Sequence, residues 1–370
     1  MSPFPREAYR PLVRYSPDRR PVDVDLSDNT SRWGPHPDVL ETIRQAAPED
    51  LVLYPPVYAD RLREAVARRF GVSVDAVATG CGSDDLLDSA FRAVCEPGEA
   101  VRYLPPTFSM IEIFARMNAL EAEPVEQAAP VAELVAEAGG GEALIDAMVE
   151  GAPGLVYLCR PNNPTGEVQP AGWVHALADA CEARGIVLLV DEAYADYLPP
   201  DTPDLLERAA GSSRIVVLRT LSKAWGMAGL RVGIAVGAPE VILEIEKSRG
   251  PYKVNRLAEA GAVAGLEDAS DWVPGVTAAA REGREALAVE LRERGLDPLP
   301  SGGNFVLLPL PGGATTDGVT AGLRERGVAV RPFGGLELPG HRAPTDCIRI
   351  SVGPPAEMNR FLTALDEVLG

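Results

Sequence analysis

The sequence has few of the residues that form disulfides and metal sites. Its 370 residues include five cysteines, with no Cys-x-x-Cys pair, and three histidines, none of them at the spacing of metal ligands. We therefore expect neither a disulfide framework nor a metal site. Scattered cysteines, several of them in apolar surroundings, are typical of buried reduced thiols: Cys81, Cys95, Cys159, Cys181 and Cys347.

Positive charge and long apolar runs are also scarce. Lys and Arg total 35 against 54 Asp and Glu, which gives a formal net charge of −19. This charge repels nucleic-acid phosphates and anionic lipid headgroups, so we expect neither as a partner, and an anionic ligand would need a local cationic pocket. No apolar run approaches the ~20 residues that span a bilayer, and the N-terminus lacks the apolar segment of a signal peptide. These features predict a cytoplasmic protein.

Short apolar runs alternate with helical patterns along most of the chain. The runs 155–158 and 186–190 are continuously apolar, which is typical of strands covered on both faces. Strands that alternate with helices predict an α/β fold with a mostly parallel central sheet flanked by helices. The expected strands of this sheet are 77–79, 100–104, 154–159, 186–190, 215–218 and 232–236.

The pattern changes after residue 255. Two Ala-rich helical stretches, separated by Pro274, precede three strand-like pieces near residues 303–308, 328–331 and 347–351. We therefore expect three parts in the chain, which is long enough for two domains. They are an N-terminal arm (1–30), a large domain (31–255) and a smaller α+β C-terminal domain (256–370).

Two ionisable side chains follow predicted strands, at the edge where open α/β sheets bind ligands. Asp191 ends the apolar run 186–190. A lone Asp there is most often a helix N-cap, but it can also pair with a protonated heterocyclic nitrogen. Lys223 comes after the run 215–218. A lone Lys is usually a surface charge, but poor solvation would lower the pKa of this amine and free it for imine formation.

Three further segments are candidate ligand loops. Ser222 and Arg231, close to several glycines, can bind an anion. The sequence Gly-Cys-Gly-Ser-Asp-Asp at 80–85 leads into a helix whose first N–H groups could hold a phosphate, although a capped helix start explains it equally well. It is neither a dinucleotide fingerprint nor a P-loop. By composition alone, Pro-Asn-Asn-Pro-Thr-Gly at 161–166 is a turn.

In combination, these motifs resemble the fold-type-I pyridoxal-phosphate aminotransferases, from about Asp25 to the C-terminus. The resemblance depends on the order and spacing of the segment 161–166, Asp-Glu-Ala-Tyr at 191–194, and Leu-Ser-Lys at 221–223 followed by Gly-Leu-Arg. It implies the fold of that superfamily, with a large cofactor-binding domain and a smaller C-terminal one. The chain is most similar to the histidinol-phosphate aminotransferase branch, on the segments 53–55, 62–65, 95–98, 105–110, 251–256 and 348–353.

The resemblance implies pyridoxal 5′-phosphate as the cofactor and assigns residues to it. Lys223 would hold the cofactor as a Schiff base and move a proton. Asp191 would keep the pyridine nitrogen protonated, while Asn163 and Tyr194 would hydrogen-bond the phenolic oxygen. Phe108 would lie flat against the ring. The phosphate would be bound by Ser83, Asp84, Ser222 and Arg231, and by Tyr54 of a neighbouring subunit, which implies a homodimer.

The resemblance also assigns substrate-binding residues. Arg349 would take the α-carboxylate as a bidentate pair, and Arg331 matches the position that meets a distal phosphate. Tyr15 would line the same end of the site, and Asn29 lies in the segment at the substrate mouth.

This mouth departs from the family pattern. The family usually has Asn-Glu-Asn-Pro here, whereas the segment 28–35 lacks the Glu and contains Arg32 and Trp33. An added cation and an indole could serve a different acid, such as an aromatic one.

The leading hypothesis is therefore a transaminase that uses a donor such as glutamate. The first candidate reaction links histidinol phosphate and imidazole acetol phosphate in histidine biosynthesis. Two alternatives stay open: an aromatic or secondary-metabolite aminotransferase of the same branch, and a pyridoxal-phosphate-dependent decarboxylase. A non-catalytic regulator is not expected, because the N-terminal stretch is too short for a DNA-binding module.

Overall fold

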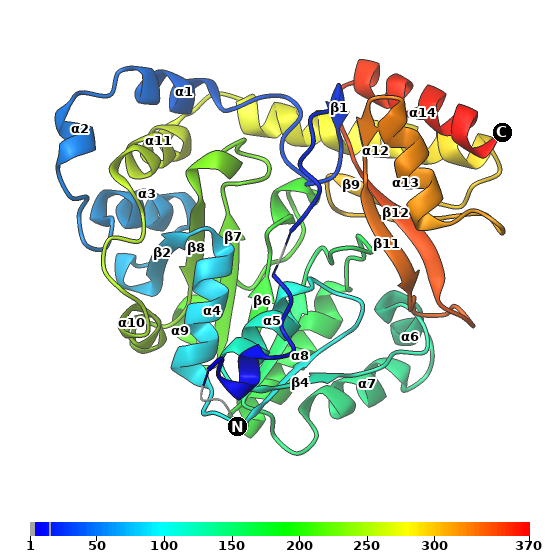
Figure 1. Cartoon of the computed structure of the whole chain (residues 1–370). Coiled ribbons are helices and arrows are strands. Elements are labelled where there is room, and N and C mark those ends of the chain that lie inside the picture. Colours follow the sequence, from blue (N-terminus) through cyan, green and yellow to red (C-terminus); the bar gives the residue numbers. More distant parts are fainter. Residues whose placement is uncertain (1–3, 15) are drawn as a thin grey trace.

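The computed structural model describes residues 4–14 and 16–370. Its centre is a seven-stranded sheet in the order β2-β8-β7-β6-β5-β3-β4 (Figure 1). Only β8 runs antiparallel to its neighbours, which confirms the predicted mostly parallel sheet. The strands are β2 (Val77–Cys81), β3 (Ala100–Tyr103), β4 (Glu121–Pro124), β5 (Leu155–Cys159), β6 (Val187–Asp191), β7 (Ile215–Thr220) and β8 (Val232–Val236).

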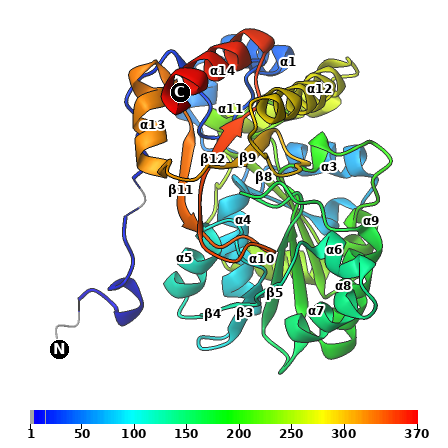
Figure 2. The ribbon, with the colours of Figure 1, turned by 90° about the vertical axis from the view of Figure 1, so that its right-hand side faces the viewer.

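Both faces of this sheet are buried under helices (Figure 2). In β6, Val187 and Leu189 pack on one side, and Leu188 and Val190 pack on the other, because successive side chains of a strand point to opposite faces. One layer contains α4 (Ser83–Val94), α5 (Met110–Met117) and α10 (Pro239–Lys247). The other contains α3 (Asp60–Phe70), α6 (Val131–Ala136), α7 (Gly140–Val149), α8 (Ala171–Arg184), α9 (Leu206–Gly211) and α11 (Arg256–Glu267).

A second, antiparallel sheet forms the C-terminal part, in the order β11-β12-β9. Its strands are β9 (Phe305–Pro309), β11 (Arg331–Leu336) and β12 (Thr345–Ser351). They pack against α12 (Trp272–Glu293), α13 (Thr316–Glu325) and α14 (Pro355–Leu369). Pro274, expected between two helices, lies in the first turn of α12, where a backbone N–H has no intrahelical acceptor to lose.

The N-terminal segment runs along the outside of the molecule and then joins the C-terminal part (Figure 2). Here β1 (Val24–Asp25) pairs in parallel with β10 (Val328–Ala329). The remaining elements are α1 (Pro37–Arg44), α2 (Glu49–Val52), η1 (Glu7–Tyr9), η2 (Val74–Ala76), η3 (Ala195–Tyr197) and η4 (Ala228–Leu230).

The domain boundaries drawn from the sequence stay a prediction, and the packing of two segments bears on them. The arm expected at 1–30 contains β1, which is hydrogen-bonded to the small domain. Helix α11, expected in the small domain, packs against α1 and α3 and contributes to the core beneath the large sheet.

Two other expectations concern cysteines and membranes. All five cysteines are free thiols, and Cys81 alone is exposed. Among the described residues, no helix is both long and apolar enough to cross a membrane.

Candidate active site

Asp191 is the last residue of β6, and its carboxylate is buried. It points to the α4 side of the sheet, like Val187 and Leu189 before it. The hydroxyl of Tyr157 donates to its Oδ2 at 2.9 Å, and the backbone N–H of Ala193 donates to its Oδ1 at 3.1 Å. Burial raises the pKa of Asp191 to about 6, although both hydrogen bonds act in the opposite direction. A cationic partner would therefore stabilise the charged form.

Lys223 follows β7, the neighbour of β6 in the sheet, and is half-buried. Its Nζ donates to the backbone carbonyl of Asp28 at 3.1 Å and lies 5.5 Å from the ring centroid of Tyr194. Burial lowers the pKa of this amine to about 8, and the guanidinium of Arg349 lowers it further. Near neutral pH a useful fraction of Lys223 is thus the neutral, nucleophilic amine.

Asn29 connects Tyr194 to the small domain. It is fully buried and has a left-handed backbone, with φ of 55°. Its Nδ2 donates to the Tyr194 hydroxyl at 3.1 Å, and its backbone N–H donates to Ser351 Oγ at 2.8 Å. Ser351 Oγ lies 3.0 Å from Asn29 Oδ1, and Asn304 Nδ2 donates to the Asn29 carbonyl at 3.1 Å. Burial raises the pKa of Tyr194 to about 12, so its hydroxyl keeps the proton.

Arg349 enters the site from β12. Its guanidinium donates to Asn163 Oδ1 and, at 2.8 Å, to the carbonyl of Ser27. The guanidinium carbon lies 5.4 Å and 5.7 Å from the ring centroids of Phe305 and Phe333, within cation–π range. Arg349 therefore has a fixed orientation. This predicted substrate-binding arginine is hydrogen-bonded directly to the predicted cofactor residue Asn163.

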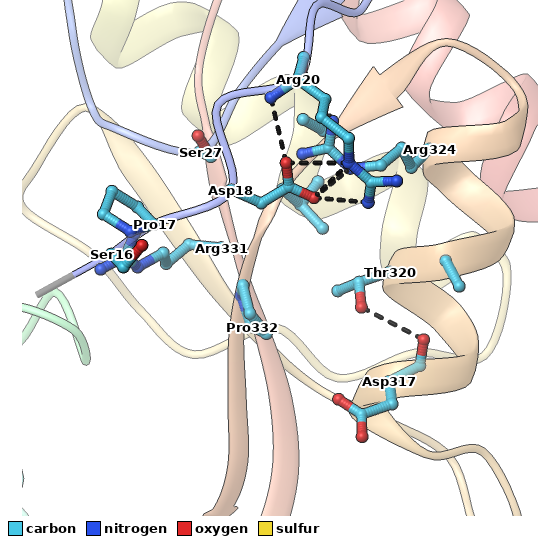
Figure 3. Close-up of a pocket in the computed structure, with 13 residues that line it drawn as sticks. Ser16, Pro17, Asp18, Arg20, Ser27, Asp317, Thr320, Arg324, Arg331 and Pro332 are labelled. Carbon is cyan, nitrogen blue, oxygen red and sulfur yellow. Dashed lines mark hydrogen bonds and ion pairs between the residues drawn. The ribbon is translucent and has the colours of Figure 1, made fainter.

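Arg331 lies directly opposite Arg349 in the β11–β12 ladder, so both side chains are on one face of the small sheet. Arg331 also lines a cavity of about 460 Å³ between the N-terminal segment, α13 and β11 (Figure 3). Ser16 and Pro17 face Arg331 across this cavity. Tyr15, the other residue predicted at this end, lies outside the described residues.

A tight backbone contact forms the remaining edge of the site. A Cβ atom on Gly233 would lie 2.2 Å from the carbonyl carbon of Gly82, so only glycine fits there. Helix α4 begins immediately afterwards with Ser83 and Asp84, whose N–H groups have no intrahelical acceptor. Arg231, at φ of 55°, places its Nη2 3.5 Å from Asp84 Oδ2. This combination of N–H groups and a guanidinium suits a phosphate.

The other predicted cofactor residues differ in their surroundings. Ser222 is buried, with its Oγ 3.0 Å from Thr220 Oγ1. Phe108 is half-buried and packs against the core on the α4 side. Tyr54 lies apart from them: it is 79% exposed and its ring stacks on Tyr252, with centroids 5.0 Å apart.

Comparison with known proteins identifies the fold and the family. The family "Aminotransferase class I and II" matches residues 21–365 of the chain. The chain belongs to this aminotransferase family. The predicted fold-type-I architecture is confirmed, because a solved histidinol-phosphate aminotransferase from Sinorhizobium meliloti, in complex with pyridoxal-5′-phosphate, superimposes with a TM-score of 0.85. That structure is 30% identical in sequence, and the match covers 100% of this chain and 98% of the other.

Curated relatives of this aminotransferase have two different names. Histidinol-phosphate aminotransferase 1 of Mesorhizobium japonicum is 35% identical over 97% of this chain and 93% of the relative. An aromatic amino acid aminotransferase of Nocardia farcinica is 36% identical over 95% of this chain and 93% of the relative. Identity at this level shows the family and the transamination chemistry, while two substrate classes stay under consideration.

Sequence reasoning missed several side chains that organise this aminotransferase's site. Tyr157, which hydrogen-bonds Asp191, lies inside a strand recognised only by its apolar character. The sequence did offer one indication of this contact. Tyr157 lies two residues before the end of β5, next to β6, so its hydroxyl could be expected near the end of the sheet where Asp191 lies. Asn29 is hydrogen-bonded by Ser351, the last residue of β12, and by Asn304, the residue before β9. No local sequence pattern connects these two residues to residue 29.

Arg32, which suggested a different acid substrate, has a structural partner. Its Nε and Nη2 donate to the two carboxylate oxygens of Glu357 at 2.8 Å and 2.7 Å. Trp33 packs between the core of the large domain and that of the small domain. Both residues therefore fasten the mouth segment to its surroundings.

His36 belongs to a group with Asp38 and Asp268 whose ligand atoms lie within 4.8 Å of one another. The two ring nitrogens already have partners. Nδ1 accepts from the Asp38 N–H at the start of α1, and Nε2 lies 3.1 Å from Asp268 Oδ2. The centroid of its ring also lies 4.8 Å from that of Trp272. This histidine therefore packs against Trp272 and caps the start of α1.

The lowered pKa of Lys223 has a measurable consequence in the cofactor-free protein. Reductive methylation should label Lys223 along a pH profile with its midpoint near 8, since only the neutral amine reacts. An ordinary lysine amine, with a pKa of about 10.4, would be labelled with a midpoint more than two pH units higher. Peptide mass spectrometry measures both profiles, with N-acetyl-lysine as the reference amine. A Lys223 midpoint near 10 would contradict this account.

Proposed function

We propose that this aminotransferase transfers an amino group from glutamate to imidazole acetol phosphate, forming histidinol phosphate, with pyridoxal 5′-phosphate as its cofactor. The supporting observation is the cross-strand pair of Arg331 and Arg349. Like charges directly opposite in a sheet repel each other, and an anion bound by both would offset this repulsion. Two guanidiniums suit a phosphate monoester, which carries close to two negative charges near neutral pH.

The residues present fit pyridoxal 5′-phosphate. Lys223 offers a neutral amine for its aldehyde, and Asp191 offers a buried carboxylate for its ring nitrogen. Asn163 and Tyr194 supply polar groups for the phenolic oxygen, and Phe108 supplies an aromatic face. The phosphate would be held at the start of α4 by Ser83, Asp84, Ser222 and Arg231. When bound, this cofactor supplies an electron sink for a carbanion at the substrate Cα.

The ionisable residues of the chain would have three different roles in the reaction. Lys223, with its pKa near 8, can accept and return the Cα proton near neutral pH. Asp191 would be kept ionised by a protonated ring nitrogen, since the opposite charge offsets its burial. Arg349, held between Phe305 and Phe333, orients the acidic group of either substrate.

An aromatic amino acid is the second candidate substrate, because the relative from Nocardia farcinica is equally similar. Arg32 does not favour that alternative, since its guanidinium is paired with Glu357.

A homodimer completes this proposal. Large apolar side chains are exposed together along the segment 51–58, in α2 and the loop that follows: Leu51, Val52, Leu53, Tyr54, Val57 and Tyr58. An exposed apolar cluster of this kind is typical of a protein interface. Tyr54 would extend from it to the cofactor phosphate of the partner subunit, in a cytoplasmic enzyme.

A substrate panel tests the reaction. With histidinol phosphate and 2-oxoglutarate, the purified holoenzyme should form glutamate at least about tenfold more efficiently than with Phe, Tyr or Trp. Glutamate formation and CO2 release are followed separately. Preference for the aromatic donors would overturn the histidinol-phosphate assignment, and CO2 release without glutamate would indicate a decarboxylase.

Replacing Arg331 tests the role of the arginine pair. In Arg331→Ala, kcat/KM for histidinol phosphate should fall by about 10- to 100-fold, because one charge-assisted hydrogen bond is worth about 1.5–3 kcal/mol. Histidinol without its phosphate should lose much less. Arg342→Ala, in the exposed stretch before β12, is the matched control and should leave both values unchanged. Equal losses for the two substrates would argue against phosphate binding by Arg331.

Co-expression tests the dimer. Tyr54→Ala subunits should bind the cofactor weakly, and Lys223→Ala subunits should be inactive. If Tyr54 acts across the interface, a mixed dimer has one site with both residues intact, so an equal mixture should recover about a quarter of the wild-type sites at limiting cofactor. No recovery in verified mixed dimers would place Tyr54 outside the partner's site.

A further inference from the structure

A second cavity, of about 320 Å³, lies between the large domain and the long helix α12. Its large-domain wall includes the chain after β6, from residue 192 to 204, and the end of α3. Its other wall is the first half of α12, through Val273, Thr277 and Arg281. In Figure 2, α12 lies above α3 and α9 at this side of the molecule. None of Asp191, Lys223, Arg331 and Arg349 lines this cavity.

Four guanidiniums line this cavity, in a chain whose net charge is −19. They belong to Arg69, Arg160, Arg219 and Arg281. Arg219 is paired with two carboxylates, at 2.6 Å from Glu192 and 3.5 Å from Asp204. Within residues 4–14 and 16–370, the other three form no salt bridge shorter than 4.0 Å.

The carboxylates of the wall already have partners. Glu192 and Asp204 accept from Arg219, and Asp196 Oδ2 accepts from the indole N–H of Trp225 at 3.2 Å. The lining contains four arginines and three carboxylates, so its formal net charge is +1. Asp196 also acts on the charges of Arg69 and Arg219, so the carboxylates of the wall are grouped around Arg219 and Arg69.

Arg160 is the most constrained of these cations. It is 3% exposed, and both acceptors of its side-chain hydrogen bonds are neutral carbonyls. Nε donates to the carbonyl of Gln169 at 3.1 Å and Nη1 to that of Pro203 at 3.0 Å. In the described part of the chain, no group accepts from Nη2. The nearby carboxylates Glu192 and Asp204 act on its charge, but both are bound by Arg219. A buried guanidinium with a free N–H group is destabilising, and an anion in the cavity would accept from it.

Arg281 faces the same cavity from α12. It is half-buried, and its Nη1 makes one long hydrogen bond, 3.4 Å, to the carbonyl of Leu198. Arg69 lies at the cavity edge with its guanidinium carbon 5.8 Å from the ring centroid of Trp225, so its N–H groups are also available. Arg160 directly follows β5, Arg69 lies in α3 and Arg281 lies in α12, so the cations reach the cavity from three parts of the fold.

We propose that this cavity binds a small oxyanion, of the size and charge of inorganic phosphate, between Arg160 and Arg281. The ligand would accept a hydrogen bond from Nη2 of Arg160 and add negative charge beside this buried cation. It would also join the chain directly after β5 to α12, the helix that leads into the small domain. Bound in this way, it stabilises one arrangement of the two domains at a place that Arg331 and Arg349 do not line.

Phosphate binding to the holoenzyme tests the proposal, because the bound cofactor then fills its own phosphate seat. Calorimetry with sodium phosphate at constant ionic strength is done on the Arg331→Ala holoenzyme, in which the proposed substrate-phosphate site is weakened. It should show one saturable site, and thermal unfolding should shift upward with phosphate concentration. Arg281→Ala should weaken this binding at least about tenfold. Arg292→Ala, an exposed arginine near the end of α12, is the matched control and should bind phosphate like the wild type.

The outcomes separate this site from the proposed function. Transamination without phosphate should be unchanged in Arg281→Ala, while Arg331→Ala should lose activity and retain phosphate binding at the cavity. Arg69→Ala gives a second, independent test, because this side chain lines the cavity and is exposed. Equal phosphate affinity in Arg281→Ala, Arg69→Ala and Arg292→Ala would overturn the proposal, as would the absence of saturable binding to the wild type.

Discussion

Burial on both faces of the central sheet is the constraint on which the rest of the structure depends. Since β6 packs under helices on either side, no ionisable group can lie along its length. The first acid appears at its end, as Asp191, and the lysine after the neighbouring strand is Lys223. The low-dielectric surroundings raise the pKa of the acid and lower that of the amine. One physical cause thus brings two groups of opposite type into the same working pH range.

The second half of the site comes from the small domain. Arg349 and Ser351 are two residues apart in β12, so their side chains lie on one face of the strand. Both contact residues near the start of the chain. Asn29 then reaches Tyr194 in the large domain, and Arg349 reaches Asn163. The predicted substrate-binding side therefore depends on contacts between residues at least 165 positions apart, which hydrophobic periodicity cannot reveal.

Local patterns predicted the elements that depend on local chemistry. The six expected strands of the large sheet are present. The strand β4 was missed, since Glu121 and Glu123 on an edge strand do not form an apolar run. The motif residues around Lys223 lie together because they follow adjacent strands. Tyr157, Asn304 and the partner of Arg32 could not be predicted, because each depends on a tertiary contact.

The pairing of β1 with β10 has a consequence for motion. Residues 24–29 are hydrogen-bonded to β10, Arg349 and Ser351, so this stretch belongs mechanically to the small domain although it lies near the start of the chain. If the small domain rotates as substrate enters, Asn29 and Arg349 travel as one rigid body, whereas Lys223 and Asp191 stay with the large sheet. Opening the enzyme would then break the Asn29–Tyr194 and Asp28–Lys223 hydrogen bonds in a single movement, so the tyrosine and the lysine would be released together.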